Sequence, residues 1–141
     1  MPVVEADFQA RKRIVFTARG RSQVNVRETL DDGPIGFSSM ELLLIALGNC
    51  SLGTLLNHAL LKDVPVHRAH ATLESEQARD PSRMGKIKLV IDLEVADPAL
   101  LARQDTLERA ADSCPVGNTL RFSPEIEVEL HMTAVPAAVP V

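Results

Sequence analysis

The chain has 141 residues, which predicts one domain, because domains average about 150 residues. Its 15 Lys and Arg and 19 Asp and Glu give a net charge of −4, which argues against a nucleic-acid-binding protein with a basic face. Four Phe, without Tyr or Trp, offer little for base stacking. The two cysteines, Cys50 and Cys114, are too few for a disulfide-rich scaffold or a four-cysteine zinc site.

The N-terminal residues 1–8 contain Glu5 and Asp7 and lack the basic start and apolar segment of a secretory signal. Residues 42–61 carry no formal charge and are long enough to span a bilayer. However, polar residues such as Asn49 and Asn57 in this stretch favour a buried helix of a soluble protein. We therefore expect a cytoplasmic protein that binds neither membranes nor nucleic acids.

A β-hairpin is predicted within about residues 10–30. Residues 13–17 are rich in β-branched and aromatic side chains, and residues 22–29 alternate between apolar and polar. Residues 18–21 form the turn between them, and the Asp, Gly and Pro of residues 31–36 predict a loop.

The strongest helix signal covers residues 38–62. Ser38 or Ser39 can cap its N-terminus, and Glu41 lies in the first turn. The helix is apolar almost all round, and a chain of this length has little material to cover it on every side. We expect it to pack at the subunit interface of a homodimer; the alternative is a single helix that lies across one sheet.

The rest of the chain predicts three strands and two helical segments. The strands cover residues 66–77, 87–95 and 125–131, the last with Ile126, Val128 and Leu130 facing inward. One helix begins after Asp97, and helical structure restarts at Pro115 and runs to Leu120. Residues 78–84 form a loop, and residues 134–141 a flexible tail. This order predicts an α+β domain with mainly antiparallel sheet.

The two cysteines are predicted to lie in different environments. Cys50 is in the middle of an apolar helix, where burial without a cation makes a thiol inert. Cys114 precedes Pro115, which favours the first helical position, so Cys114 would be an N-cap at a helix end that stabilises a thiolate. The alternative for each is a small buried core residue. In a reducing compartment, such a pair more often reflects catalysis, redox sensing or chance than architecture.

Other chemistries fit the sequence less well. A dithiol that reduces peroxides needs a cation beside its nucleophile, and Arg19 and Arg21 in the hairpin turn are candidates; alternatively, both are simply solvated. His67 and His70 would point to opposite faces of a strand, so no metal site is expected. His58 lies about 12 Å along the helix from Cys50, too far for Cys–His catalysis.

Two motifs resemble a known family. Positions 36–50 read GFSSMELLLIALGNC and positions 114–120 read CPVGNTL. They resemble the GxxPxELLLxALGxC and CPVxNxL signatures of the OsmC/Ohr (osmotically inducible protein C and organic hydroperoxide resistance) superfamily, over about residues 10–133. The resemblance implies antiparallel sheets around long central helices, an intertwined homodimer and thiol-dependent reduction of organic hydroperoxides.

Carried over by motif position, Cys50 corresponds to the peroxidatic cysteine and Cys114 to the resolving one, and Arg19 or Arg21 to the essential arginine. The family pattern has a glutamate ten residues before the peroxidatic cysteine, where this chain has Met40. Glu41 lies one position later, on the opposite helix face from Cys50, which favours a role at the helix N-terminus. Ser39 also replaces the usual proline. These departures favour the OsmC-like branch.

Two functions follow from these features. The first is a thiol peroxidase that reduces small organic hydroperoxides in oxidative-stress defence and is regenerated by a thiol reductant. The alternative is a non-peroxidase OsmC-like dimer that binds a small apolar ligand, and a dimer with a purely structural role is a third hypothesis. None of these functions requires a cofactor or a metal.

Overall fold

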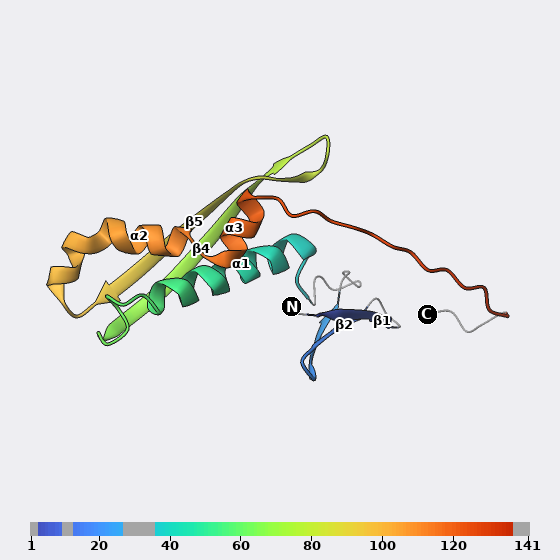
Figure 1. The fold of residues 1–141 in the computed structure, drawn as a ribbon, viewed down its shortest axis with the longest axis horizontal. Coiled ribbons are helices and arrows are strands. Elements are labelled where there is room, and N and C mark those ends of the chain that lie inside the picture. The colour runs from blue at the N-terminus through green and yellow to red at the C-terminus, as the bar shows by residue number, and fades with distance from the viewer. Residues whose placement is uncertain (1–2, 10–12, 27–35, 137–141) are drawn as a thin grey trace. The chain divides into compact units, whose positions relative to one another are not determined.

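The computed structural model describes residues 3–9, 13–26 and 36–136 (Figure 1). They divide into two compact units, Leu42–Ile126 and a second that combines Met1–Glu41 with Glu127–Val141. Each unit is described by itself below. The prediction of a single domain over residues 1–141 stays a prediction.

An antiparallel three-stranded sheet with the order β1-β2-β3 forms the N-terminal unit. The strands are β1 (Glu5–Gln9), β2 (Arg13–Ala18) and β3 (Arg21–Val26), and the β2–β3 hairpin is confirmed. Its two-residue turn places Arg19 at φ 50° and Gly20 at φ 72°, which matches the twist of the strands it joins. The sequence did not predict β1, whose charged residues obscure its alternation. Residues 27–35 of the predicted hairpin and loop lie outside the described residues.

Asn25 joins β3 to the residues before the long helix. Its buried side-chain amide accepts a hydrogen bond from the Phe37 N–H at 2.8 Å and donates one to the Phe37 carbonyl at 2.9 Å. The paired bonds satisfy both polar groups of a buried amide, which would otherwise destabilise the fold. They fix the residue that precedes the helix cap.

The long helix, α1 (Ser39–Leu56), begins as predicted but ends early. Ser38 Oγ accepts from the Glu41 N–H at 3.1 Å, and Glu41 Oε1 accepts from the Ser38 N–H at 2.8 Å, a reciprocal capping box. The predicted end at Lys62 is wrong. The chain turns at His58, whose Nδ1 accepts from the Leu60 N–H at 3.1 Å and whose carbonyl accepts from Leu61 and Lys62.

Length and composition alone would let α1 cross a membrane, and 22% of this 18-residue helix is buried. Its buried residues contact the rest of the Leu42–Ile126 unit: a Cβ on Gly48 would lie 2.9 Å from the Leu73 side chain. Ser51, which is fully buried, donates a hydrogen bond to the Ala111 carbonyl. These contacts make α1 a packed helix of a globular unit.

Two long antiparallel strands, β4 (Val66–Ala78) and β5 (Arg83–Val95), form one hairpin. The predicted alternation is confirmed, because the apolar positions are partly buried and the intervening positions are mostly exposed. On the exposed face, oppositely charged residues face each other across the strands, as in the pairs Arg68–Glu94 and Glu74–Lys88. The sheet therefore has one apolar face and one solvated face.

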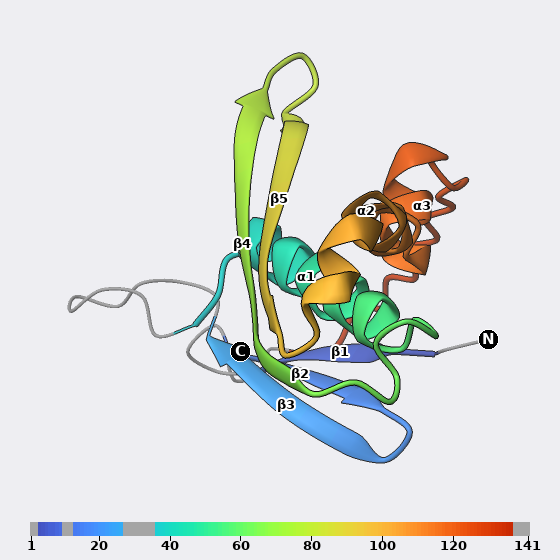
Figure 2. The ribbon, with the colours of Figure 1, turned by 90° about the vertical axis from the view of Figure 1, so that its left-hand side faces the viewer.

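Helix α1 and the helices that follow β5 pack on the same face of the β4–β5 hairpin (Figure 2). After β5, the Asp97 side chain caps the 3₁₀ helix η2 (Pro98–Arg103), as predicted. Helices α2 (Gln104–Asp112) and α3 (Pro115–Arg121) follow. The core between helices and sheet consists of Leu55, Leu61, Leu100, Leu107 and Ala111, and is covered by Ile91, Leu93 and Val95 of β5.

The last predicted strand, residues 125–131, is wrong for the single chain. The segment is extended, but it is not part of either described sheet. Ile126, Val128 and Leu130, expected to face inward, are 81%, 86% and 79% exposed. Alternation of apolar and polar residues does not by itself make a strand, because the backbone also needs a neighbouring strand as a hydrogen-bond partner. Residues 134–136 of the predicted tail are exposed, and residues 137–141 lie outside the described residues. The fold class, α+β with antiparallel sheets, is confirmed.

Candidate functional site

Cys114 lies in the short turn that connects α2 to α3. It is the N-cap of α3, in extended conformation at φ −70° and ψ 150°, and Pro115 follows at the first helical position. Its Sγ accepts a hydrogen bond from the Gly117 N–H at 3.3 Å, and the residue is 1% exposed. The N-cap role predicted from the Cys-Pro pair is confirmed.

The electrostatic consequence predicted for this cap is wrong. Burial raises the pKa of the Cys114 thiol above its ordinary value of 9.0, and the Gly117 hydrogen bond lowers the pKa by less. The Cys50 side chain raises the Cys114 pKa further, through a hydrogen bond and through its charge. Desolvation disfavours the charged form more than the helix end favours it. Cys114 is therefore held as a protonated thiol.

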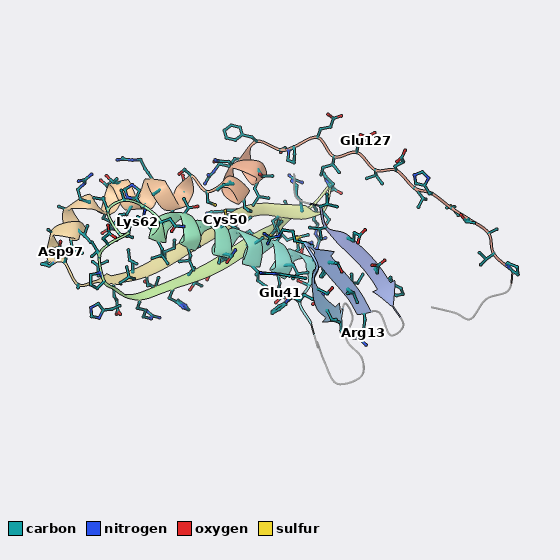
Figure 3. All side chains as sticks on the ribbon, turned by 60° about the horizontal axis from the view of Figure 1, so that its bottom comes forward. Arg13, Glu41, Cys50, Lys62, Asp97 and Glu127 are labelled. Atoms are coloured by element: carbon teal, nitrogen blue, oxygen red, sulfur yellow. The ribbon has the colours of Figure 1, made fainter. Side chains whose placement is uncertain are left out.

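Cys50 is partly exposed in the middle of α1 (Figure 3), whereas the sequence predicted full burial. Only one side of α1 is buried, the side that includes Leu47 and Ser51, and Cys50 lies beside that buried face. The Ser51 hydroxyl binds the Ala111 carbonyl, so the turn of α1 that carries Cys50 lies against the end of α2, three residues before Cys114, and the Cys50 side chain is close enough to affect the Cys114 pKa. Two cysteines far apart in sequence therefore share one site, in which one thiol is accessible and the other is buried.

Arg19 and Arg21 are exposed at the turn of the β2–β3 hairpin. They belong to the N-terminal unit, whereas both cysteines belong to the Leu42–Ile126 unit. The assignment of either arginine to the thiol pair stays a prediction. Glu41 is engaged in the capping box, as expected for a carboxylate at the helix N-terminus, and Met40 beside it is 49% exposed.

The family model described as OsmC-like protein matches residues 30–129. The chain belongs to the OsmC-like family. Both cysteine motifs of the thiol site fall inside the matched region. No match was found among the curated proteins.

Solved structures of OsmC-like proteins have the same fold. The OsmC-like protein of Mycoplasma pneumoniae is 15% identical, with a TM-score of 0.71 over 87% of this chain and 89% of that one. A Psychrobacter arcticus protein, described as an osmotic stress induced and detoxification response protein, is 19% identical, with a TM-score of 0.67 over 84% and 88%. The organic hydroperoxide resistance protein OsmC of Legionella pneumophila is 13% identical, with a TM-score of 0.58 over 86% and 89%.

Sequence reasoning missed two contacts that hold the Cys114 turn of this OsmC-like protein. The Ser51 hydroxyl donates to the Ala111 carbonyl at 2.8 Å, and the Arg121 guanidinium binds the Asp112 carboxylate and donates to the Asp112 carbonyl at 2.6 Å. Pro115 could have indicated the Ser51–Ala111 contact, because a proline four residues after Ala111 leaves the Ala111 carbonyl without its usual helical donor and in need of another.

Three histidines of the OsmC-like chain belong to the same unit as the two cysteines. His67 and His70 are exposed on β4, and His58 follows the end of α1, where its ring accepts from the backbone. Within residues 3–9, 13–26 and 36–136, no group of three or more His, Cys, Asp or Glu side chains is placed to hold a metal ion.

Proposed function

We propose that this OsmC-like protein is a thiol peroxidase that reduces organic hydroperoxides and acts in oxidative-stress defence. The supporting observation is the pair of thiols with unequal accessibility: Cys50 is partly exposed, and Cys114 is buried beside it. A peroxidase of this type needs one thiol that meets the peroxide and a second that waits as a thiol until the first is oxidised.

The proposed cycle has three balanced steps. The Cys50 thiolate attacks the hydroperoxide ROOH, the O–O bond breaks, and Cys50 becomes a sulfenic acid while RO⁻ takes a proton to leave as an alcohol. The Cys114 thiol then forms a disulfide with the sulfenic sulfur and water leaves. A dithiol reductant finally reduces the disulfide to two thiols by exchange and is itself oxidised. Two electrons pass from the reductant to the peroxide in each cycle.

The nucleophile also needs a cation, since a thiolate within apolar surroundings is unstable alone. Arg19 or Arg21 is proposed for this role, by correspondence with the family arginine. The guanidinium keeps its charge at all working pH values and donates several hydrogen bonds, which suits both a thiolate and a developing alkoxide. Their position at the tip of a hairpin leaves both side chains exposed for such a contact.

A homodimer in the cytoplasm is part of the proposal. Much of α1 is left uncovered by its own chain, and Phe37 before it and Ile45 on it are 49% and 47% exposed. The apolar residues of the extended segment 125–132 are exposed as well. A monomer rarely leaves so much apolar surface open to water, and a second copy supplies both a helix and strand edges to cover it. Light scattering should give twice the 15.3 kDa mass of the chain.

Met40 favours the alternative, a dimer that binds a small apolar ligand without reducing it. This methionine occupies the position of the family glutamate, and it is half exposed, like Phe37. With no carboxylate there to orient the arginine, the thiolate would lose part of its stabilisation. The apolar, aliphatic surroundings would suit an alkyl chain better than a planar ring.

Consumption of cumene hydroperoxide by the full-length protein, with dithiothreitol as reductant, separates the two functions. The wild type should turn over repeatedly, and Cys50→Ser should lower the rate to that of dithiothreitol alone. Arg19→Met and Arg21→Met form a matched pair, because each removes one charge from the same hairpin turn. We expect the rate to fall in one of them only. A Cys50→Ser variant as fast as the wild type would refute the proposal.

A further inference from the structure

Ser51 is the residue after Cys50, and its side chain is fully buried, with 0% exposure. Its hydroxyl donates a 2.8 Å hydrogen bond to the Ala111 carbonyl, 60 residues away in the sequence and three residues before Cys114. The contact thus joins the helical turn that carries Cys50 to the end of the helix that leads into Cys114.

The Ala111 carbonyl needs this partner. In a continuing helix it would accept from the N–H four residues later, but that residue is Pro115, which has no N–H. Ala111 is buried, so water is a poor substitute, and an unpaired buried carbonyl destabilises a fold. The proline that makes Cys114 an N-cap therefore also creates the acceptor that Ser51 fills.

The same turn of α1 also packs against the chain after Cys114, where Leu47 lies near Gly117. A Cβ placed on Gly117 would lie 3.3 Å from the Cys114 Sγ and 3.7 Å from the Leu47 Cδ1. Leu47 and Ser51 are one helical turn apart, and Cys50 lies between them in the sequence. The Leu47–Ser51 turn of α1 therefore contacts the chain on both sides of Cys114, at Ala111 before it and at Gly117 after it.

We propose that Ser51 is a positioning residue for the disulfide between Cys50 and Cys114, because its hydrogen bond to Ala111 sets the register of α1 against the turn that carries Cys114. The inference rests on the thiol pair of the proposed function, but it concerns the bond between the sulfurs, not the peroxide. Loss of the hydroxyl allows α1 to rotate or slide against α2. Since a hydrogen bond contributes about 1 kcal/mol, a factor of roughly 5 to 10, the effective concentration of the two thiols should fall by about that factor.

Equilibrium with glutathione measures this quantity without any peroxide. Two protein thiols and one oxidised glutathione exchange to one protein disulfide and two reduced glutathiones. When half of the protein is oxidised, the squared concentration of reduced glutathione divided by the concentration of oxidised glutathione gives the effective concentration of the two thiols. Full-length wild type, Ser51→Ala, Ser51→Thr and Asp97→Ala are equilibrated over a series of glutathione ratios. Mass spectrometry after acid quench gives the fraction with the Cys50–Cys114 disulfide, and thermal unfolding gives the stability of each variant.

Asp97→Ala is the matched control. It removes a side-chain hydrogen bond, to the Ala99 N–H at 3.0 Å, in the same unit but away from the α1–α2 contact. We expect it to lower the melting temperature to a similar degree and to leave the effective concentration within twofold of the wild type. Ser51→Ala should lower the effective concentration about 5- to 10-fold, and Ser51→Thr, which keeps the hydroxyl, should stay within about threefold of the wild type.

An effective concentration in Ser51→Ala equal to that of the wild type would overturn the inference, as would equal losses in Ser51→Ala and Asp97→Ala. A wild type that forms no Cys50–Cys114 disulfide at any glutathione ratio would overturn both the inference and the proposed resolving step. A wild type that forms the disulfide, with the expected Ser51 effect, but does not consume cumene hydroperoxide would support the inference and refute the peroxidase.

Discussion

The two cysteines lie in neighbouring segments that differ in how far they expose the thiol to solvent. Cys50 is on a regular helical turn that is covered on one side, so its thiol is partly accessible. Cys114 is in a break between two helices, where its sulfur is 1% exposed and is held by the Gly117 N–H. Each environment suits one half of a dithiol reaction. An accessible thiol can meet a bulky substrate, and a buried thiol can react only with a neighbour.

The Cys114 turn also shows that a helix N-terminus does not by itself activate a thiol. The Gly117 hydrogen bond lowers the pKa of Cys114, but burial raises that pKa by more. A cap stabilises a thiolate strongly only where the sulfur also remains solvated or meets a cation.

The largest expected effect is on the oxidised form of the protein. Cys114→Ser should abolish the internal disulfide, so that one equivalent of cumene hydroperoxide leaves a lasting sulfenic acid on Cys50, which dimedone traps. In the wild type, dimedone labelling should be low because Cys114 reacts first. Mass spectrometry of both proteins, with the unoxidised proteins as the control, checks this. Equal dimedone labelling of the two would remove the resolving role from Cys114.

Next in size is the difference in alkylation. At pH 7, iodoacetamide should modify Cys50 in the Cys114→Ser variant at least about tenfold faster than it modifies Cys114 in the Cys50→Ser variant, because reaction requires an exposed thiolate. The rates come from a mass spectrometric time course. Similar rates would mean that the Cys114 turn opens readily and that the contrast between the two sites is lost in solution.

A smaller effect is expected on stability against pH. The pKa of Cys114 is raised in the folded state, so folding favours its protonated form. Its contribution is fully present below the pKa of the thiol in the unfolded chain and is lost as the pH rises through the higher folded value. Urea unfolding between pH 7 and 10 should show a loss of stability in the wild type that is weaker in Cys114→Ser. Parallel curves for the two proteins would contradict the raised pKa.

The smallest effect concerns the ion pair between Arg121 and Asp112, at the ends of the two helices that flank Cys114. Both side chains are largely exposed, so Arg121→Met should lower the free energy of unfolding by only about 0.5–1 kcal/mol. Urea unfolding measures this, and the alkylation rate of Cys114 should change less than twofold. A large increase in that rate would show that the outer ion pair keeps Cys114 buried.

Sequence patterns predicted the elements whose stabilising contacts are local. The β2–β3 hairpin, the Ser38–Glu41 cap, the β4–β5 alternation and the Cys114 N-cap each depend on neighbours in the chain or on a simple period. They therefore appear where the patterns place them. The two motifs also lie in neighbouring segments, because Ser51 beside Cys50 binds the end of the helix that precedes Cys114; their role as a functional site stays a prediction.

The remaining features depend on contacts that no local pattern records. The end of α1 is set by turns at His58, and the exposure of Cys50 by which face of the helix finds a partner. Residues 125–131 have the alternation of a strand, yet neither of the two described sheets includes them. The sign of the Cys114 pKa shift depends on the depth of burial, which only the packed structure gives.

The side-chain amide of Asn25 carries the same donor and acceptor as a peptide group, so its two bonds to Phe37 imitate one rung of a β-ladder. Asn25 and Phe37 are 12 positions apart, so the two bonds join residues that are not neighbours in the sequence. The entropic cost of bringing two residues together grows slowly with the number of residues between them, by about 0.6 kcal/mol for each doubling. Doubling the number of residues between Asn25 and Phe37 should therefore weaken their pairing, which joins the hairpin to the helix cap, by only about that amount.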